Sequence, residues 1–467
     1  MASTSSIDGV AGGAGHLKAS RLDMLSGPLD VFAQPVTHDL IERRVQGTRY
    51  TQTPLNSKGP YTFILPPEGD SFLDVGRIKL YGEISITNGG ANLTDTDHVA
   101  VVNMIAGSLM ENITIYIDNH PLNANCNTDM PYKAVIPTML SYGSDAAKTH
   151  LRCQGFHMDD ANRFEKYLAV DTEDEDGDII DEANDGFIAR MKWTTKSRIV
   201  HFCTPLPIDF LRTDRLFVPG RELKLQMTRA KDEFLLLSSS TDKKYNIEVH
   251  ELYLMYERVF LKPQVFDTFM KQWTLGQAAL YPSNQTSILR IPLPANITTF
   301  NIPYVYQGTL PQHLMLAFVE SEALNGSFKT NPFYFHHYYV NYIDLKINGM
   351  SIPNEAYRPC FDSANGKAMK YMREYYAMME NIGIYRSDKG CQVTYELYEG
   401  GCFIVPYDLT PDGCNQYHHH AEKTGLVQLQ LGFEKPTTKA ITLLVIMSHQ
   451  QVVGLLRKET QPIRFIF

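Results

Sequence analysis

Alternating hydrophobic and polar positions dominate the chain from residue 61 onward. The aliphatic residues of Ile78–Ile86 fall on alternate positions, as do the apolar residues of 113–117, 343–347 and 427–433. A period of two places these side chains on one face of a β-strand. The pattern therefore predicts a protein built mainly of strands, each with one apolar face.

The same series of signals occurs in both halves of the chain. Each half has a strand that ends in a tight turn, a helix candidate rich in Tyr and Met, a Pro-x-Asp motif, and a glycine followed by an alternating strand. The Pro-x-Asp motifs, at Pro207 and Pro406, are 199 residues apart, and the glycines, Gly220 and Gly425, are 205 apart. Both offsets are close to half of the 467 residues, so they predict two copies of one domain in tandem.

Helices are expected at two places, residues 131–142 and 367–380. Pro131 suits a first helical position, whereas Pro137 is expected to kink or split the first helix. Gly383 suits the end of the second helix, because glycine readily adopts the left-handed conformation found there.

Strands with one apolar face bury that face against another sheet, so each half is interpreted as a β-sandwich or jelly roll. The predicted fold class is all-β, with two tandem jelly-roll domains and short helical insertions. We expect a flexible N-terminal arm at 1–45, a first jelly roll at 46–262 and a second at 263–467. The expected join is Lys262-Pro263-Gln264, where a strand ends and a proline-marked connection begins.

The formal net charge of −9 has a local origin. Residues 171–185 hold nine acidic residues and no basic one, and without them 43 acidic residues balance 43 basic ones. A neutral body has no electrostatic footprint for nucleic acid. The longest apolar run, Ile441–Met447, is far shorter than the roughly 18 residues that a membrane span needs. Met1–Gly15 lacks a secretory pattern, so we expect synthesis in the cytoplasm and reduced, mostly buried thiols for the seven scattered cysteines.

A histidine run is the one cluster that suggests catalysis. Metal-binding jelly rolls of the cupin type use His-x-His followed by Glu, and His418, His420 and Glu422 supply these residues, with His449 as a further ligand candidate. Glu422 comes too early for the usual spacing, so a surface loop is the competing interpretation.

Two other segments contain residue types that occur in catalytic or metal sites. His336 and His337 lie among aromatic residues, where packing or a subunit contact is the competing interpretation to catalysis. Placing Gly177 at the sixth position of a calcium loop puts Thr172 first and Ala183 last, where carboxylates are required. We therefore expect no enzyme activity, no cofactor and no metal site, and we expect the acidic residues to form an exposed loop.

Ordered strings in both halves carry a family resemblance. Those of the second half are Asn331–Tyr338, Asn348-Gly349, Ile352-Pro353 and Pro406–Asp412. Those of the first half are Asp30–Phe32, Pro35–Thr37, Ser71–Val75, Leu216–Leu225 and Thr228–Phe234. Together they resemble capsid-like proteins of Polinton/Maverick-type elements, their adintovirus and adomavirus relatives, and endogenous animal copies. The acidic residues 171–185 depart from this family's pattern.

The resemblance implies a double jelly-roll major capsid protein of the lineage that includes adenovirus hexon. In that lineage three chains form a pseudo-hexagonal capsomer, and capsomers tile an icosahedral shell around double-stranded DNA. The implied partners are other copies of the chain and penton or minor capsid proteins, with no specific nucleic-acid site and no membrane span.

Two alternatives stay open from the sequence. A jelly-roll binding module or metal-dependent cupin-like enzyme would bring His and carboxylate ligands together on facing strands. A host-domesticated copy would keep the fold without building virions.

Overall fold

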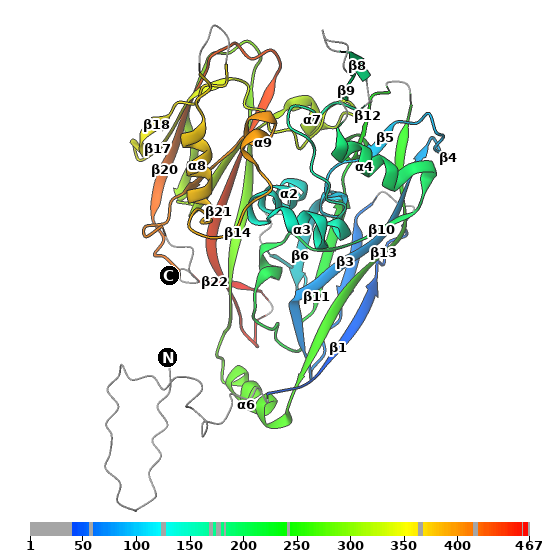
Figure 1. Cartoon of the computed structure of the whole chain (residues 1–467). Coiled ribbons are helices and arrows are strands. Elements are labelled where there is room, and N and C mark those ends of the chain that lie inside the picture. The colour runs from blue at the N-terminus through cyan, green and yellow to red at the C-terminus, as the bar shows by residue number, and fades with distance from the viewer. Residues whose placement is uncertain are drawn as a thin grey trace, which may run out of the picture.

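The computed structural model describes residues 40–55, 59–122, 128–167, 171–173, 179–181, 184–240, 243–362, 368–413, 419–459 and 461–465. Its main strands form two similar groups, one in each half of the chain (Figure 1). The expected arm lies outside the described residues as far as residue 39. Residues 41–45 differ from that expectation, because they open strand β1 (Ile41–Tyr50), which pairs along β13 (Tyr245–Leu261).

The first half contains two antiparallel four-stranded arrays. The array that we call the first back sheet has the order β1, β13, β3 (Phe72–Asn88), β10 (Val200–Pro205), with β4 (Ala91–Asn92) paired to β3. The first front sheet has the order β2 (Tyr61–Leu65), β11 (Leu223–Arg229), β6 (Met110–Ile117), β7 (His120–Leu122).

The second half repeats this arrangement. The second back sheet has the order β14 (Ala279–Leu293), β21 (Ile441–Leu455), β16 (His313–Glu320), β19 (Ile404–Asp408), with β22 (Ile463–Phe465) paired to β21. The second front sheet has the order β15 (Thr299–Thr309), β20 (Thr424–Phe433), β17 (Val340–Ile347), β18 (Met350–Tyr357). Two further pairs join β5 (Val99–Val101) to β12 (Leu236–Ser238) and β8 (Asp171–Glu173) to β9 (Ile179–Asp181).

The two halves share one strand order. In the back sheets β1, β13, β3 and β10 correspond to β14, β21, β16 and β19, and in the front sheets β2, β11, β6 and β7 correspond to β15, β20, β17 and β18. Two facing four-stranded antiparallel sheets with this crossed order are a jelly roll. The all-β, double jelly-roll fold predicted from the sequence is therefore confirmed.

A side-chain contact also recurs and corrects the repeat offset. Oδ1 of Asp118, in the turn after β6, accepts a hydrogen bond from Glu222 N at 3.0 Å. Oδ1 of Asn348, in the turn after β17, accepts one from Leu426 N at 2.9 Å. Glu222 and Leu426 thus correspond, and 426 minus 222 gives an offset of 204, not 205. The correction matters because a one-residue shift exchanges the buried and exposed rows of a strand.

The core lies between the front and back sheets of each half. The alternating rows predicted to face inward are buried: Ile113, Ile115, Ile117, Ile343, Leu345, Ile347, Val427, Leu429, Leu431 and Phe433. Gly82 interrupts the aliphatic row of β3. A Cβ placed there would lie 2.5 Å from Phe202 Cζ of β10, so the missing side chain makes room for this ring.

The two expected helices are present with adjusted bounds. The first, α2 (Met130–Ser141), runs through Pro137 without being split. The second, α8 (Met372–Asn381), begins five residues later than expected and ends as predicted at Gly383, which has a φ of 78°. There Gly383 N donates to Glu380 O and Ile384 N to Met379 O, the pair of bonds of a Schellman motif.

Two long helices were not predicted. The helix α6 (Pro263–Thr274) lies between β13 and β14, and its Pro263, taken as a loop signal, occupies the first turn. The helix α4 (Asp185–Thr194) follows the acidic segment and is capped by Asn184, whose side chain accepts from Phe187 N. The remaining helical turns are α1 (Ile105–Ser108), α3 (Ser144–Lys148), η3 (His150–Gln154), η4 (Thr195–Ser197), η5 (Asp209–Arg212), α5 (Asp232–Leu235), α7 (Ser321–Asn325) and α9 (Tyr395–Gly400).

Candidate functional site

The two halves stack in the same orientation, front to back. In Figure 1 the second front sheet, the second back sheet and then the first half follow one another from left to right, with the first back sheet at the right-hand side. At the junction, the front of the first half therefore faces the back of the second half. The surfaces to compare are therefore the junction between the halves and the two outer faces that the junction does not cover.

The helix α2 provides the upper contact of the junction. Its N-cap residue Asp129 forms an ion pair with Arg290 of β14. The ring of Tyr132 lies 5.8 Å from Phe333 and 6.3 Å from Phe335, both in the second half. Ten of the twelve residues of α2 are buried, as expected for a helix that is packed on both sides.

Tyr281 of β14 provides the lower contact. Its ring lies 5.7 Å from Phe210 and 6.0 Å from Phe217, both in the first half. Its hydroxyl accepts from Val218 N at 3.0 Å and donates to Leu216 O at 3.2 Å. Burial raises the pKa of this hydroxyl well above its ordinary value, so it remains a neutral donor across the physiological range.

A buried ion pair lies beside the junction. Arg190 of α4 is fully buried, and its Nη2 lies 2.7 Å from Oδ1 of Asp159. Its Nε donates to Val101 O at 2.9 Å and its Nη1 to His157 O at 2.6 Å. Oδ2 of Asp159 accepts from Asn331 Nδ2 of the second half at 3.1 Å. The network therefore ties α4 to residues 157–159 and links both to the second half.

The junction covers the outer face of the second back sheet. Phe318 of β16 points inward, since its ring contacts Phe433 of the front sheet, so Ala317 faces outward. Leu444 of β21 is paired with Ala317 on one side and with Arg290 of β14 on the other, so the three residues share this outward face. Ala317 and Leu444 are completely buried.

The described residues leave most of the corresponding face of the first back sheet uncovered. An aromatic row crosses it, made of Tyr50 of β1, Tyr253 of β13, Tyr81 of β3 and His201 of β10. Successive ring centroids are separated by 5.3, 4.7 and 6.5 Å. Tyr50 is 58% exposed. Partial burial and a hydrogen bond to Glu83 raise the pKa of Tyr81, so this hydroxyl donates to a carboxylate and stays neutral.

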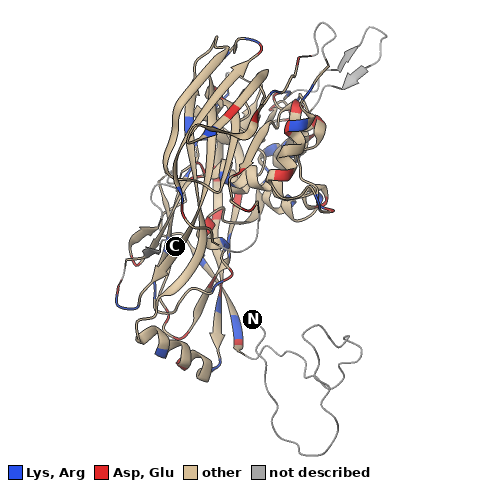
Figure 2. Cartoon of the chain, turned by 90° about the vertical axis from the view of Figure 1, so that its left-hand side faces the viewer, with Lys and Arg blue, Asp and Glu red and all other residues tan. Residues whose placement is uncertain are grey.

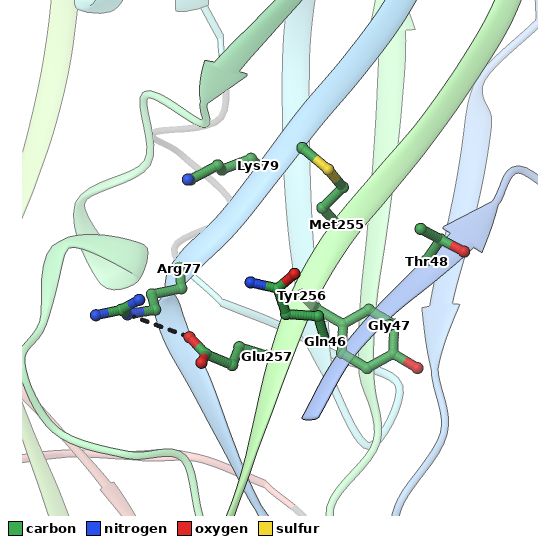
Figure 3. Close-up of a pocket in the computed structure, with 8 residues that line it drawn as sticks. All are labelled: Gln46, Gly47, Thr48, Arg77, Lys79, Met255, Tyr256 and Glu257. Carbon is green, nitrogen blue, oxygen red and sulfur yellow. Dashed lines mark ion pairs between the residues drawn. The ribbon is translucent and has the colours of Figure 1, made fainter. Parts of the chain in front are cut away.

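A hollow lies on the same face, since Thr48, Lys79 and Met255 in its lining are each two residues from a tyrosine of the aromatic row. Its lining residues are drawn in Figure 3. The hollow has a volume of 270 Å³ and is lined by Gln46, Gly47, Thr48, Arg77, Lys79, Met255, Tyr256 and Glu257. Arg77 Nε lies 3.2 Å from Glu257 Oε2, and Arg44 Nη1 lies 3.4 Å from the same oxygen. A second, more open hollow of 560 Å³ adjoins Tyr81 and His201 and is walled by Trp193 of α4.

The helix α8 is the second-half counterpart of α2, because each is the first helix after the corresponding strand, β7 or β18. Only two of its ten residues, Glu374 and Met378, are buried. Met372 is 67% and Tyr376 54% exposed, and Met369 just before the helix is also exposed. These three residues form an apolar stripe on the side of α8 that faces away from its own half.

The histidine run does not form a ligand set in the described residues. His418 lies outside them. His420 Nε2 lies 3.4 Å from Asp412 Oδ1, whereas His449 Nε2 lies 3.1 Å from Thr309 O. Within the described parts of the chain, no group of three or more His, Cys, Asp or Glu side chains could hold a metal ion.

His336 and His337 are packed inside the second half. The His337 ring stacks on Phe361 at 3.9 Å. Nδ1 of His336 accepts from Tyr338 N and Nδ1 of His337 from Tyr339 N, each at 2.9 Å. Burial lowers the pKa of both histidines, that of His336 to about 4, so both rings act as neutral acceptors that shape a turn.

The structure describes only part of the acidic segment. The acidic segment is described only at β8, β9 and from Asn184 onward, so the nine-carboxylate loop lies largely outside the described residues.

The described cysteines are free thiols, and only Cys402 is fully buried while Cys153 is exposed, which corrects the expectation of mostly buried thiols. Among the described residues, the positions of basic and acidic residues are interspersed along the ribbon of Figure 2, in line with a near-neutral body. No helix in the described residues is long and apolar enough to cross a membrane.

Comparisons with known proteins place the fold. No family model matches the chain. An uncharacterized protein of Caenorhabditis elegans is 22% identical over 415 residues, which cover 84% of this chain and 91% of that protein. A chain in the structure of the Sputnik virophage matches 98% of this chain and 93% of its own length with a TM-score of 0.61 and 13% identity.

Two further solved structures agree. The major capsid protein of mavirus matches 98% of this chain and 97% of its own length at a TM-score of 0.52 and 10% identity. That of Faustovirus matches 93% of both chains at a TM-score of 0.52 and 9% identity. These neighbours are double jelly-roll proteins, so the resemblance found in the sequence is confirmed at the level of the fold.

Proposed function

We propose that this chain, which has the double jelly-roll fold of viral major capsid proteins, is itself a structural major capsid protein. Its unit is a homotrimer, a pseudo-hexagonal capsomer that tiles an icosahedral shell around a double-stranded DNA genome. It acts through its surfaces and has no catalytic role.

The front-to-back stacking of two jelly rolls in one chain is the observation that carries this proposal. The front-to-back contact within one chain leaves one front and one back without a partner. Front-to-back contacts between copies form a ring when the rotation from each copy to the next adds up to a full turn. Three chains supply six jelly rolls, which is the count for a six-sided tile. A single chain supplies only two of the six sides.

The chain divides by function along its sequence. We propose a first jelly roll that begins with β1 at Ile41 and runs to residue 262, a second at 263–467, and an arm before β1 that contacts neighbouring capsomers. The further partners are penton or minor capsid proteins. The near-neutral body gives no basis for a specific nucleic-acid site. The place of action is the virion capsid, after synthesis in the cytoplasm.

One alternative has an observation in its favour. The relative of 22% identity is a protein of an animal, Caenorhabditis elegans. A chain of this fold maintained in an animal genome, without building virions, is therefore the second candidate. A binding module or cupin-like enzyme has no comparable support among the described residues, where His420 and His449 contact different partners.

The test of the proposal is the mass of the purified full chain, measured by size-exclusion chromatography with light scattering at micromolar concentration. One chain has a mass of 53.0 kDa, so a trimer has three times 53.0, or 159 kDa. A mass of 159 kDa supports the capsomer. A stable 53 kDa monomer in physiological buffer contradicts it. Particle formation in cells that express the chain then separates the capsid protein from the non-virion copy.

A further inference from the structure

The repeated fold predicts where a second copy of the chain would bind. Within one chain, α2 of the first half lies on the outer face of the second back sheet, with Asp129 against Arg290 of β14. The same topology recurs in both halves, so the equivalent contact joins α8 of the second half to a first back sheet. No single chain can make this contact, because α8 packs on the second half beside β19, whereas the first back sheet lies on the side of the first half that is turned away from the second half (Figure 1).

Both of these unused faces carry a run of apolar or aromatic side chains among charged ones. On α8 the stripe consists of Met369, Met372 and Tyr376, of which Met372 is the most exposed. On the first back sheet the aromatic row crosses all four strands from Tyr50 to His201. Contiguous exposed apolar patches on soluble proteins mark interaction sites. Each face thus has the character of a surface that is covered in the assembled protein.

The charges on the two faces are complementary. Glu83 of β3 and Glu251 of β13 are directly paired across the first back sheet beside the aromatic row. Like charges in this position destabilise a sheet unless a cation neutralises them. Lys370, two residues before α8, and Arg373 in its first turn flank the apolar stripe. Both are exposed, and Arg373 also donates to Glu355 O at 3.1 Å within its own half. A second copy would bring these cations to the paired carboxylates.

We propose that the α8 stripe of one chain packs on the aromatic row of the first back sheet of a second copy, with Lys370 and Arg373 directed at Glu83 and Glu251. This inference rests on the proposed homotrimer and assigns the residues of its subunit contact. The occupant of each bare face is another copy of this chain. The 560 Å³ hollow beside Trp193 widens the receiving surface next to Tyr81.

A photo-crosslink tests the contact directly. p-Benzoylphenylalanine in place of Tyr376 keeps an aromatic ring at an exposed position and captures its neighbour on irradiation. The expected product is a crosslinked dimer whose partner peptide comes from β1, β3, β10 or β13. A crosslink to another surface, an α8-to-α8 crosslink, or no crosslink in a trimeric sample overturns the inference while the trimer stands. A monomeric sample overturns the proposed function as well.

Charge reversal gives an independent measurement of the same contact. The double variant Glu83→Lys with Glu251→Lys should raise the trimer dissociation constant at least about tenfold per reversed charge, because like charges then face each other. Adding Lys370→Glu and Arg373→Glu should restore the trimer. The matched control is Leu275→Glu, an exposed apolar residue just after α6 and outside both faces, which should leave the mass unchanged. A reversal variant that stays fully trimeric, or a rescue that fails in a folded protein, contradicts the assignment.

Discussion

Removing the carboxylate of Asp159 should destabilise the folded chain strongly. Asp159→Ala leaves Arg190 fully buried without its counter-charge, which lies 2.7 Å away in the native protein. Losing one partner of a buried pair costs about 3–5 kcal/mol, because the remaining charge has neither water nor a counter-ion. Oδ2 of Asp159 also accepts from Asn331 of the second half, so the link between the halves is lost with it.

The assay is urea unfolding of purified variants at pH 7, with the unfolding free energy taken from the midpoint and slope. The control is Lys196→Ala, which breaks the exposed pair between Lys196 and Asp95 and should cost less than about 1 kcal/mol. The double variant Asp159→Leu with Arg190→Met should recover most of the loss, since it leaves no unpaired charge. If Asp159→Ala costs no more than the control, the buried pair does not stabilise the junction as argued.

Three further predictions concern the arm, the acidic segment and the buried histidines. Deleting residues 1–39, which precede β1, should spare the trimer and impair shell formation; normal shells seen by electron microscopy would contradict this. So negative a loop would repel DNA phosphates if it faced the genome, so we expect the acidic loop on the outside of the shell. Replacing the nine acidic residues of 171–185 by Asn or Gln should therefore change the electrophoretic mobility of intact particles without changing their DNA content. Unchanged mobility with altered packaging would place the loop inside. Lowering the pH should destabilise the fold between about pH 6.5 and 4, because burial lowers the pKa of His336 to about 4 and the unfolded state takes up the proton first. The unfolding free energy should fall by up to about 1.4 kcal/mol per pH unit for each such histidine, and a flat profile would refute the buried neutral state.

The sequence predicted the fold well where the signal was local. The alternating rows of β6, β17 and β20 identified the buried faces, because a strand with one wet face has a strict period of two. The end of α8 at Gly383 was also predicted, since a left-handed glycine is a local requirement. The two turns that end β6 and β17 marked the repeat correctly.

The errors arose where local signals were ambiguous. Pro263 was taken as a loop residue although it starts α6, because proline favours both loops and first helical turns. The repeat offset of 205 was one residue too large, because Gly220 and Gly425 are not equivalent; the paired turns give 204. Glycines cannot reveal an error of one residue, because they have no side chain to assign to the buried or the exposed row.

The bare faces could not be predicted from local patterns. Tyr50, Tyr81, His201 and Tyr253 are spread over about two hundred residues and meet only because β1, β3, β10 and β13 are neighbours in one sheet. One signal was present, because Tyr81 occupies the polar row of an alternating strand, where an aromatic ring is unusual. The exposed stripe of α8 likewise depends on knowing which side of the helix its own half covers.

Cryo-electron microscopy of the purified oligomer tests the central claim most directly. The account predicts a threefold particle with six jelly rolls in one ring, alternating between first and second halves, and with every front packed on the back of the next. It further predicts α8 of each chain on the β1–β13–β3–β10 sheet of its neighbour. A monomer, or a twofold dimer joined front to front or back to back, would contradict the capsomer.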